Sequence, residues 1–150
     1  MEKPIYPISY SPDQYWYEFD SISENKIIRK VVFYTVFSEM PNTYQLVFGN
    51  LTSENKIDTV DKSNNKDMKI ILATVIQTLM YFLELNPNIS VIFTGSTQSR
   101  TRLYRATISK LLDSLDESYI IEGLTFDLEK ERFDADKHYF AYLISKNHGK

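Results

Sequence analysis

A long apolar run in the middle of the chain constrains the fold more than any other feature. Residues 68–85 are almost continuously apolar, and the run is interrupted by Lys69, Gln77 and Glu84. The apolar positions recur at helical spacing, and they widen into a surface that leaves only a narrow polar stripe. The sequence therefore predicts a helix over about 66–85 that other elements cover on more than one side.

Polar residues mark both ends of this helix. Asn64 or Asn65 is expected at the N-cap, and Asp67 is expected in the first turn, where a carboxylate opposes the positive end of the helix dipole. Asn86 and Pro87 end the helix.

The remaining runs have strand character, and their order predicts the fold class. Val, Ile, Tyr and Phe are concentrated in residues 15–19, 27–38 and 43–48, which predict an antiparallel meander ended by Gly49, and 56–60 predicts a fourth strand returning beside the third. A buried strand at 90–94, a second helix at about 98–115 and two strands near 119–125 and 139–145 follow. We expect an α+β fold, in which an antiparallel β-meander, a βαβα unit and two C-terminal strands form a mixed sheet with two main helices.

Composition indicates one ordered domain. The chain has 150 residues, 43% of them hydrophobic, 14% aromatic and 25% charged, which excludes a disordered chain. Residues 1–150 are expected to form a single globular domain with frayed ends at 1–12 and 147–150.

Charge and cysteine usage narrow the classes of function. Acidic residues outnumber basic ones by 20 to 17, so the surface as a whole does not steer nucleic acid, and any such binding needs a local basic patch. The chain has no cysteine, which suits a reducing cytoplasm. Its first residues lack an apolar targeting segment. We expect a cytoplasmic protein without membrane association.

One stretch, "IFTGSTQSRTRLYR" at 92–105, has the residue types of an anion site. Gly95 permits a tight turn and close approach of a ligand, and Ser96 and Thr97 supply hydroxyls. Arg100 and Arg102 can form charge-assisted hydrogen bonds to a phosphate or carboxylate. The alternative is structural: Ser96 or Thr97 caps the helix, Gly95 serves the turn, and the arginines are solvated or pair with acidic residues.

A second polar stretch is expected to face the first. If strands 56–60 and 90–94 are parallel in one sheet, the loops that follow them open at one edge. The crevice would then join two helix starts, as ligand sites of open α/β sheets do. Its predicted ligand-binding residues are Ser63, Asn64, Asn65, Gly95, Ser96, Thr97, Arg100, Arg102 and Tyr104.

Other patterns are weaker. The aromatic residues of the first strands, from Tyr15 to Phe37, are expected in a core or a partner interface, with base stacking as the alternative. The acidic segment 127–137 is expected to be a solvated loop, and His138 to be a surface or packed histidine rather than a general base. We assign no catalytic residue, no metal and no cofactor.

Three segments carry a resemblance to a known family. "SNNKDMKIILATV", "GSTQSRTRLYR" and "KHYFAYLISK" resemble, in order and spacing, a family of uncharacterised bacterial proteins common among Bacteroidetes. Its members share a Ser-Asn-Asn helix start and a Gly-Ser-Thr-x-x-Arg-Thr-Arg-Leu-Tyr signature. The resemblance spans residues 15–146 and implies no reaction, but it singles out the same two helix starts.

Three functions are compatible with these patterns. The leading expectation is a small binding protein that recognises an anionic group, such as a phosphate of a nucleotide or nucleic acid. The alternative is a protein-interaction module of a bacterial defence or toxin–antitoxin system, with an acidic protein partner or a second copy as a homodimer. The third is an enzyme acting on a phosphorylated substrate, which ranks last because no base or metal set accompanies the arginines.

Overall fold

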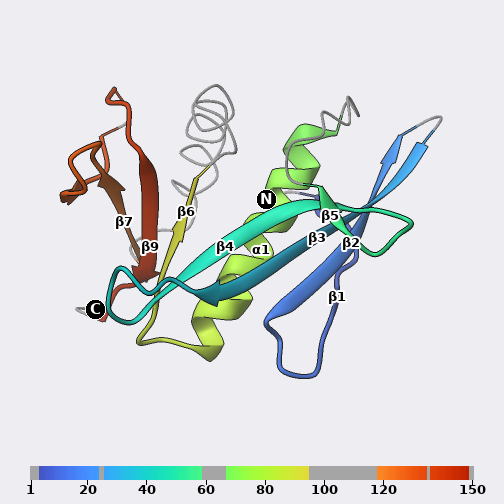
Figure 1. The fold of residues 1–150 in the computed structure, drawn as a ribbon, viewed down its shortest axis with the longest axis horizontal. Coiled ribbons are helices and arrows are strands. Elements are labelled where there is room, and N and C mark those ends of the chain that lie inside the picture. Colours follow the sequence, from blue (N-terminus) through green and yellow to red (C-terminus); the bar gives the residue numbers. More distant parts are fainter. Residues whose placement is uncertain (1–3, 24–25, 59–66, 95–117, 135, 149–150) are drawn as a thin grey trace. The chain divides into compact units, whose positions relative to one another are not determined.

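Strands dominate the part of the chain that the computed structural model describes, which is residues 4–23, 26–58, 67–94, 118–134 and 136–148. This part contains a nine-stranded mixed sheet and one α-helix (Figure 1). In chain order the elements are β1 (Ser9–Tyr10), β2 (Trp16–Ser23), β3 (Lys26–Val36), β4 (Thr43–Leu51), β5 (Ile57–Asp58), α1 (Met68–Leu85), β6 (Ser90–Phe93), β7 (Tyr119–Leu124), β8 (Lys130–Arg132) and β9 (Ala141–Lys146).

The expected α+β fold with two main helices is wrong for this part of the chain, which is sheet-dominated. The one described helix, α1, agrees with the first predicted helix. The second, predicted at about 98–115, lies outside the described residues. The charged segment 127–137 was expected to be a loop, but β8 lies within it because Lys130–Arg132 pair with β7.

The chain divides into two compact units, the first made of residues 1–35 and 46–82. In this unit β1 pairs with β2 and β2 with β3, both antiparallel, and β5 pairs with β4, also antiparallel. Strand β3 neighbours β4, so the predicted meander and its returning fourth strand are confirmed.

The core of the first unit lies between α1 and the strands. Tyr17, Phe19 and Tyr34 alternate along β2 and β3 onto one sheet face and are buried. The ring of Phe82 on α1 stacks on Tyr34 at a centroid distance of 4.1 Å. The expectation that these aromatic residues belong to a core is therefore confirmed for the inward-facing set.

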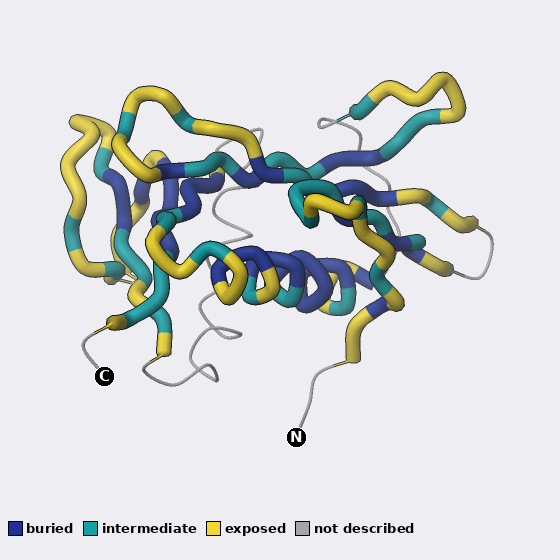
Figure 2. Tube along the Cα trace, turned by 90° about the horizontal axis from the view of Figure 1, so that it is seen from below, coloured by how far each residue is buried: buried dark blue, intermediate teal, exposed yellow. Residues whose placement is uncertain are grey.

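The helix α1 is covered on several sides, as its sequence predicts. Every residue from Ile71 to Ile76 is buried (Figure 2). By length and hydropathy alone α1 would suit a membrane span, but 56% of that window is buried inside this protein, as in a core helix.

The second unit consists of residues 36–45 and 83–150. The first residues of β4 pair with β6 in parallel, and β6 pairs with β9 antiparallel. Strand β9 pairs with β7, and β7 with β8, both antiparallel. Ile92, Leu124, Ala141 and Leu143 form its buried cluster.

The direction of β6 relative to β5 differs from the prediction. The crevice required strands 56–60 and 90–94 to be parallel in one sheet, but β6 runs parallel to β4 whereas β5 turns back antiparallel onto β4. A two-residue β5 after a short turn returns along the strand that precedes it. Strands β5 and β6 therefore run in opposite directions, and the topology no longer predicts that the loops after 60 and after 94 open at one sheet edge.

Gly49 does not end the third strand, since β4 continues to Leu51. A Cβ atom at position 49 would lie 2.8 Å from the carbonyl oxygen of Asp58 and 2.9 Å from a methyl carbon of Ile57. Glycine is thus needed here for the close approach of β5 rather than for a turn.

The start of α1 also differs from the prediction. The first helical hydrogen bond runs from the amide of Ile71 to the carbonyl of Asp67, at 2.9 Å, and no acidic residue lies in the first turn. Asp67 therefore occupies the N-cap position that was predicted for Asn64 or Asn65. Its carboxylate accepts hydrogen bonds from Tyr6 and Ser21, as described below.

Gly123 in β7 gives a direct test of the second unit. A Cβ at this position would lie 2.3 to 2.4 Å from three ring atoms of Tyr139, which is buried. We expect Gly123→Ala to lower the free energy of unfolding by about 1–3 kcal/mol, because the ring must move out of a packed position. Urea unfolding measures the loss.

The control is the same substitution in a Tyr139→Ala background. There Gly123→Ala should cost much less, since the clash is gone. Equal costs in both backgrounds would contradict this account of the glycine.

Candidate functional site

The predicted site residues do not fall in the described part of the chain. Ser63, Asn64 and Asn65 lie within 59–66, and the remaining six lie within 95–117; both segments are outside the described residues. They are Gly95, Ser96, Thr97, Arg100, Arg102 and Tyr104. What the structure describes is the strand that leads into the second segment.

The carboxyl end of that strand, β6, is fixed by burial and by hydrogen bonds. Val91, Ile92 and Phe93 are buried, and β6 lies between β4 and β9. The hydroxyl of Thr94 donates a hydrogen bond of 2.9 Å to the carbonyl oxygen of Phe140. The residue before Gly95 is therefore fixed to the start of β9.

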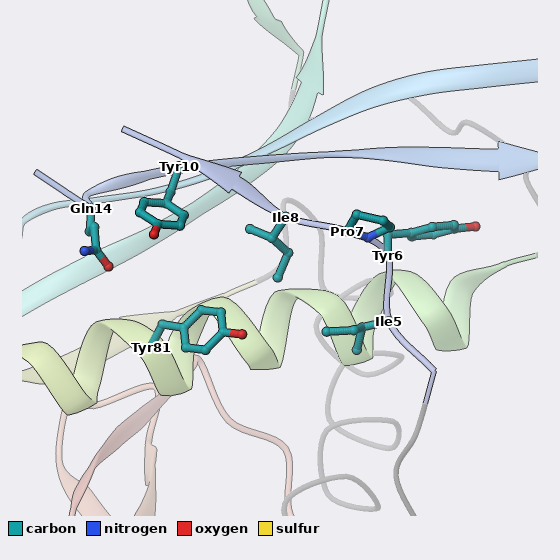
Figure 3. Close-up of a pocket in the computed structure, with 7 residues that line it drawn as sticks. All are labelled: Ile5, Tyr6, Pro7, Ile8, Tyr10, Gln14 and Tyr81. Carbon is teal, nitrogen blue, oxygen red and sulfur yellow. The ribbon is translucent and has the colours of Figure 1, made fainter. Parts of the chain in front are cut away.

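A different hollow is visible in the first unit, and we name it the tyrosine hollow. It has a volume of about 500 Å³, within the range of small-molecule pockets. It lies between the N-terminal segment and the outer side of α1 (Figure 3). Its lining consists of Ile5, Tyr6, Pro7, Ile8, Tyr10, Gln14 and Tyr81.

Tyr6 fastens the N-terminal wall of the hollow. Its amide donates to the hydroxyl of Thr74 on α1 at 3.0 Å, and its own hydroxyl donates to the carboxylate of Asp67. Ser21 of β2 donates to the same carboxylate oxygen at 2.6 Å. Burial, and then the hydrogen bond to Asp67, raise the pKa of Tyr6. The segment expected to fray thus includes a buried, hydrogen-bonded residue at position 6.

Two exposed tyrosines form the mouth of the hollow. Tyr10 on β1 is 58% exposed, and Tyr81 on α1 is 43% exposed. Figure 3 shows them on opposite walls, with Ile8 to one side. Exposed aromatic rings of this kind offer faces for stacking and hydroxyls for hydrogen bonds.

Gln14 is held in an unusual backbone conformation. Its φ of 58° lies in the left-handed region, which costs free energy for a residue with a side chain. The turn is fixed by the amide of Gln14, which donates to the carbonyl of Ser11 at 2.9 Å. In Figure 3 the side-chain amide of Gln14 extends toward the hollow.

Behind this wall lies a buried hydroxyl without a partner. Tyr17 is fully buried, and its hydroxyl makes no hydrogen bond within the described ranges. Its ring lies 6.2 Å from that of Tyr10. Burial, and then the neighbouring Tyr10, Asp13 and Tyr81, raise the pKa of Tyr17 to about 12. Sequence reasoning missed this group, because a tyrosine in a strand pattern does not indicate whether its hydroxyl will have a hydrogen-bond partner.

Other clusters in the described chain are structural. Glu131 accepts from Lys137 at 2.7 Å and from Tyr139 at 2.9 Å, which lowers the pKa of its carboxyl group. No group of three metal-ligating side chains occurs among the described residues. His138 is exposed.

The unpartnered hydroxyl of Tyr17 predicts an unusual response to mutation. Tyr17→Phe should raise the free energy of unfolding at pH 7 by about 1–3 kcal/mol, because it removes a buried donor that makes no bond. Urea unfolding measures the change. The matched control is Tyr34→Phe: Tyr34 is equally buried, but its hydroxyl bonds to Thr78 at 2.9 Å, so that this change should destabilise. A loss of stability in both variants would refute the assignment.

The same hydroxyl predicts a dependence on alkaline pH. Because its folded pKa of about 12 lies above the ordinary 10.0, the hydroxyl ionises in the unfolded chain before it does so in the folded one, and the free energy of unfolding falls as the pH rises from 10 toward 12. Tyr17→Phe should therefore unfold at a higher pH than the wild type. Circular dichroism across pH 9–12 measures the midpoint of unfolding.

Comparison with known proteins identifies a family but no activity. No curated protein and no solved structure matches the chain significantly. One family model, described as a family of unknown function (DUF6934), matches residues 2–147. This match covers nearly the whole sequence and agrees with the resemblance to an uncharacterised family. The chain therefore belongs to the family of unknown function DUF6934.

Proposed function

We propose that this protein is a small binding protein that recognises an anionic group through residues 95–102. The observation that carries the proposal is the order Gly95-Ser96-Thr97, then Arg100 and Arg102, directly after a buried strand. A glycine, hydroxyls and guanidinium groups together suit a phosphate of a nucleotide or of a nucleic acid.

The anchoring of β6 supports this proposal. Hydrogen bonds on both sides of the strand and the Thr94 bond to Phe140 fix the described residues that precede Gly95. A binding segment that follows a rigid strand end has a lower entropy cost of holding a ligand.

The charge balance also bears on the proposal. The net charge of the chain is −3, so anion binding must come from a local cluster. Among the described residues, Arg29 is already paired with Glu18 and Asp20, at 2.7 and 2.6 Å. Arg100 and Arg102, two residues apart, are therefore our candidates for a phosphate contact.

The predicted second half of the crevice has less support. Ser63, Asn64 and Asn65 were joined to it by the parallel orientation of strands 56–60 and 90–94, which the structure contradicts. Our proposal therefore depends on the segment after β6 alone. Tyr104 remains a predicted ligand contact on the same segment.

A charge-matched pair of variants tests the proposal. We expect phosphate, a nucleotide or a short oligonucleotide to raise the melting temperature of the wild type at low salt, because ligand binding stabilises the folded state. Arg102→Ala should lose this rise. Arg132→Ala removes the same charge at an exposed position of β8 and should keep it.

Thermal-shift measurements at low and physiological salt provide the readout. No shift with any of these anions, or an equal shift in Arg102→Ala and the wild type, would overturn the proposal.

A protein-interaction role is the second proposal, and exposed apolar side chains favour it. Phe126 is 56% exposed, Leu128 64% and Phe140 45%. The rings of Phe126 and Phe140 lie 6.3 Å apart, so these side chains form one apolar surface in the second unit. An acidic protein partner or a second copy of the chain would fit such a role, in a cytoplasmic bacterial setting.

A further inference from the structure

The tyrosine hollow calls for a ligand of a different chemistry from that of the anion segment. None of its seven lining residues carries a charge. A charged ligand would lose its hydration there without gaining an ion pair, which is unfavourable. The lining thus selects for an uncharged molecule.

The walls also select for a flat shape. Tyr10 and Tyr81 present half-exposed rings from opposite sides, and Ile5, Pro7 and Ile8 add apolar surface along the N-terminal segment. Aromatic rings prefer to stack on or pack edge-on against another ring. A planar ring fits between these walls better than a flexible chain does, because it loses less conformational freedom.

One polar side chain gives the hollow its hydrogen-bonding character. The amide of Gln14 extends toward the hollow and can donate a hydrogen bond to a carbonyl oxygen.

We propose that the tyrosine hollow binds a small uncharged ligand with a planar ring and a carbonyl acceptor, held between Tyr10 and Tyr81 and hydrogen-bonded by Gln14. This site is separate in sequence from residues 95–102 and does not rest on the anion proposal.

Three matched probes test the ligand class by NMR titration of the ¹⁵N-labelled full chain. Benzamide is neutral, planar and bears a carbonyl; benzoate adds a charge; cyclohexanecarboxamide removes the planarity. We expect benzamide to shift the amide resonances of Tyr10, Gln14 and Tyr81 with a Kd of roughly 1 mM, as for a fragment of its size. The other two probes should bind several-fold more weakly.

Variants assign the contacts. Tyr81→Ala should weaken benzamide binding about tenfold, since one stacking wall is lost. Leu85→Ala removes an exposed apolar side chain from the same helix outside the hollow and should leave binding unchanged. Gln14→Gly removes the amide while it relieves the left-handed backbone, so that a loss of binding cannot come from misfolding.

Tyr17→Phe changes the stability without changing the lining of the hollow. It should leave benzamide binding unchanged, because the Tyr17 hydroxyl is buried and Tyr17 does not line the hollow. The proposal is overturned if benzamide shifts no resonance of the hollow at 10 times the expected Kd. Equal binding of benzoate, or unchanged binding in Tyr81→Ala, would overturn it as well.

Discussion

The burial of α1 against the strands of the first unit is the constraint on which the rest of that unit depends. Phe82 stacks on Tyr34 at 4.1 Å, and the hydroxyls of Tyr34 and Thr78 bond at 2.9 Å across the same contact. Since α1 is apolar over most of its surface, it also needs cover beyond this contact. The N-terminal segment contributes cover one turn earlier on the same helix, where the amide of Tyr6 bonds to Thr74 at 3.0 Å.

The polar groups of this core explain why the hollow has its present form. Threonines inside a helix must satisfy their hydroxyls, and Thr74 does so by donating to the carbonyl of Ile70 and accepting from Tyr6. The carboxylate of Asp67 holds Tyr6 and Ser21 together at the helix start. In contrast, the Tyr17 hydroxyl and one carboxylate oxygen, Oδ1 of Asp67, have no hydrogen-bond partner among the described residues. These two atoms are exceptions in a core in which the hydroxyls of Thr74 and Thr78 are hydrogen-bonded.

Local patterns predicted the elements well and their partners poorly. The run 66–85 predicted α1, and the alternating aromatic residues predicted β2 and β3. The same reasoning assigned Gly49 to a strand end and made β5 parallel to β6. Both errors concern which backbone lies beside which, and a short strand such as Ile57–Asp58 is too brief for its side chains to specify a neighbour.

The sequence by itself determined the strands, the apolar helix and the residue types after β6 that suit an anion. Each of these follows from a hydrophobic periodicity or a motif within consecutive residues. Only the tertiary structure decided that β6 runs parallel to β4 and that Tyr10, Gln14 and Tyr81 line one hollow with Tyr17 behind it. Those relations join residues far apart along the chain. They depend on the surfaces that α1 buries and on the hydrogen bonds that Tyr6 makes to Thr74 and Asp67. Neither can be predicted from a local sequence pattern.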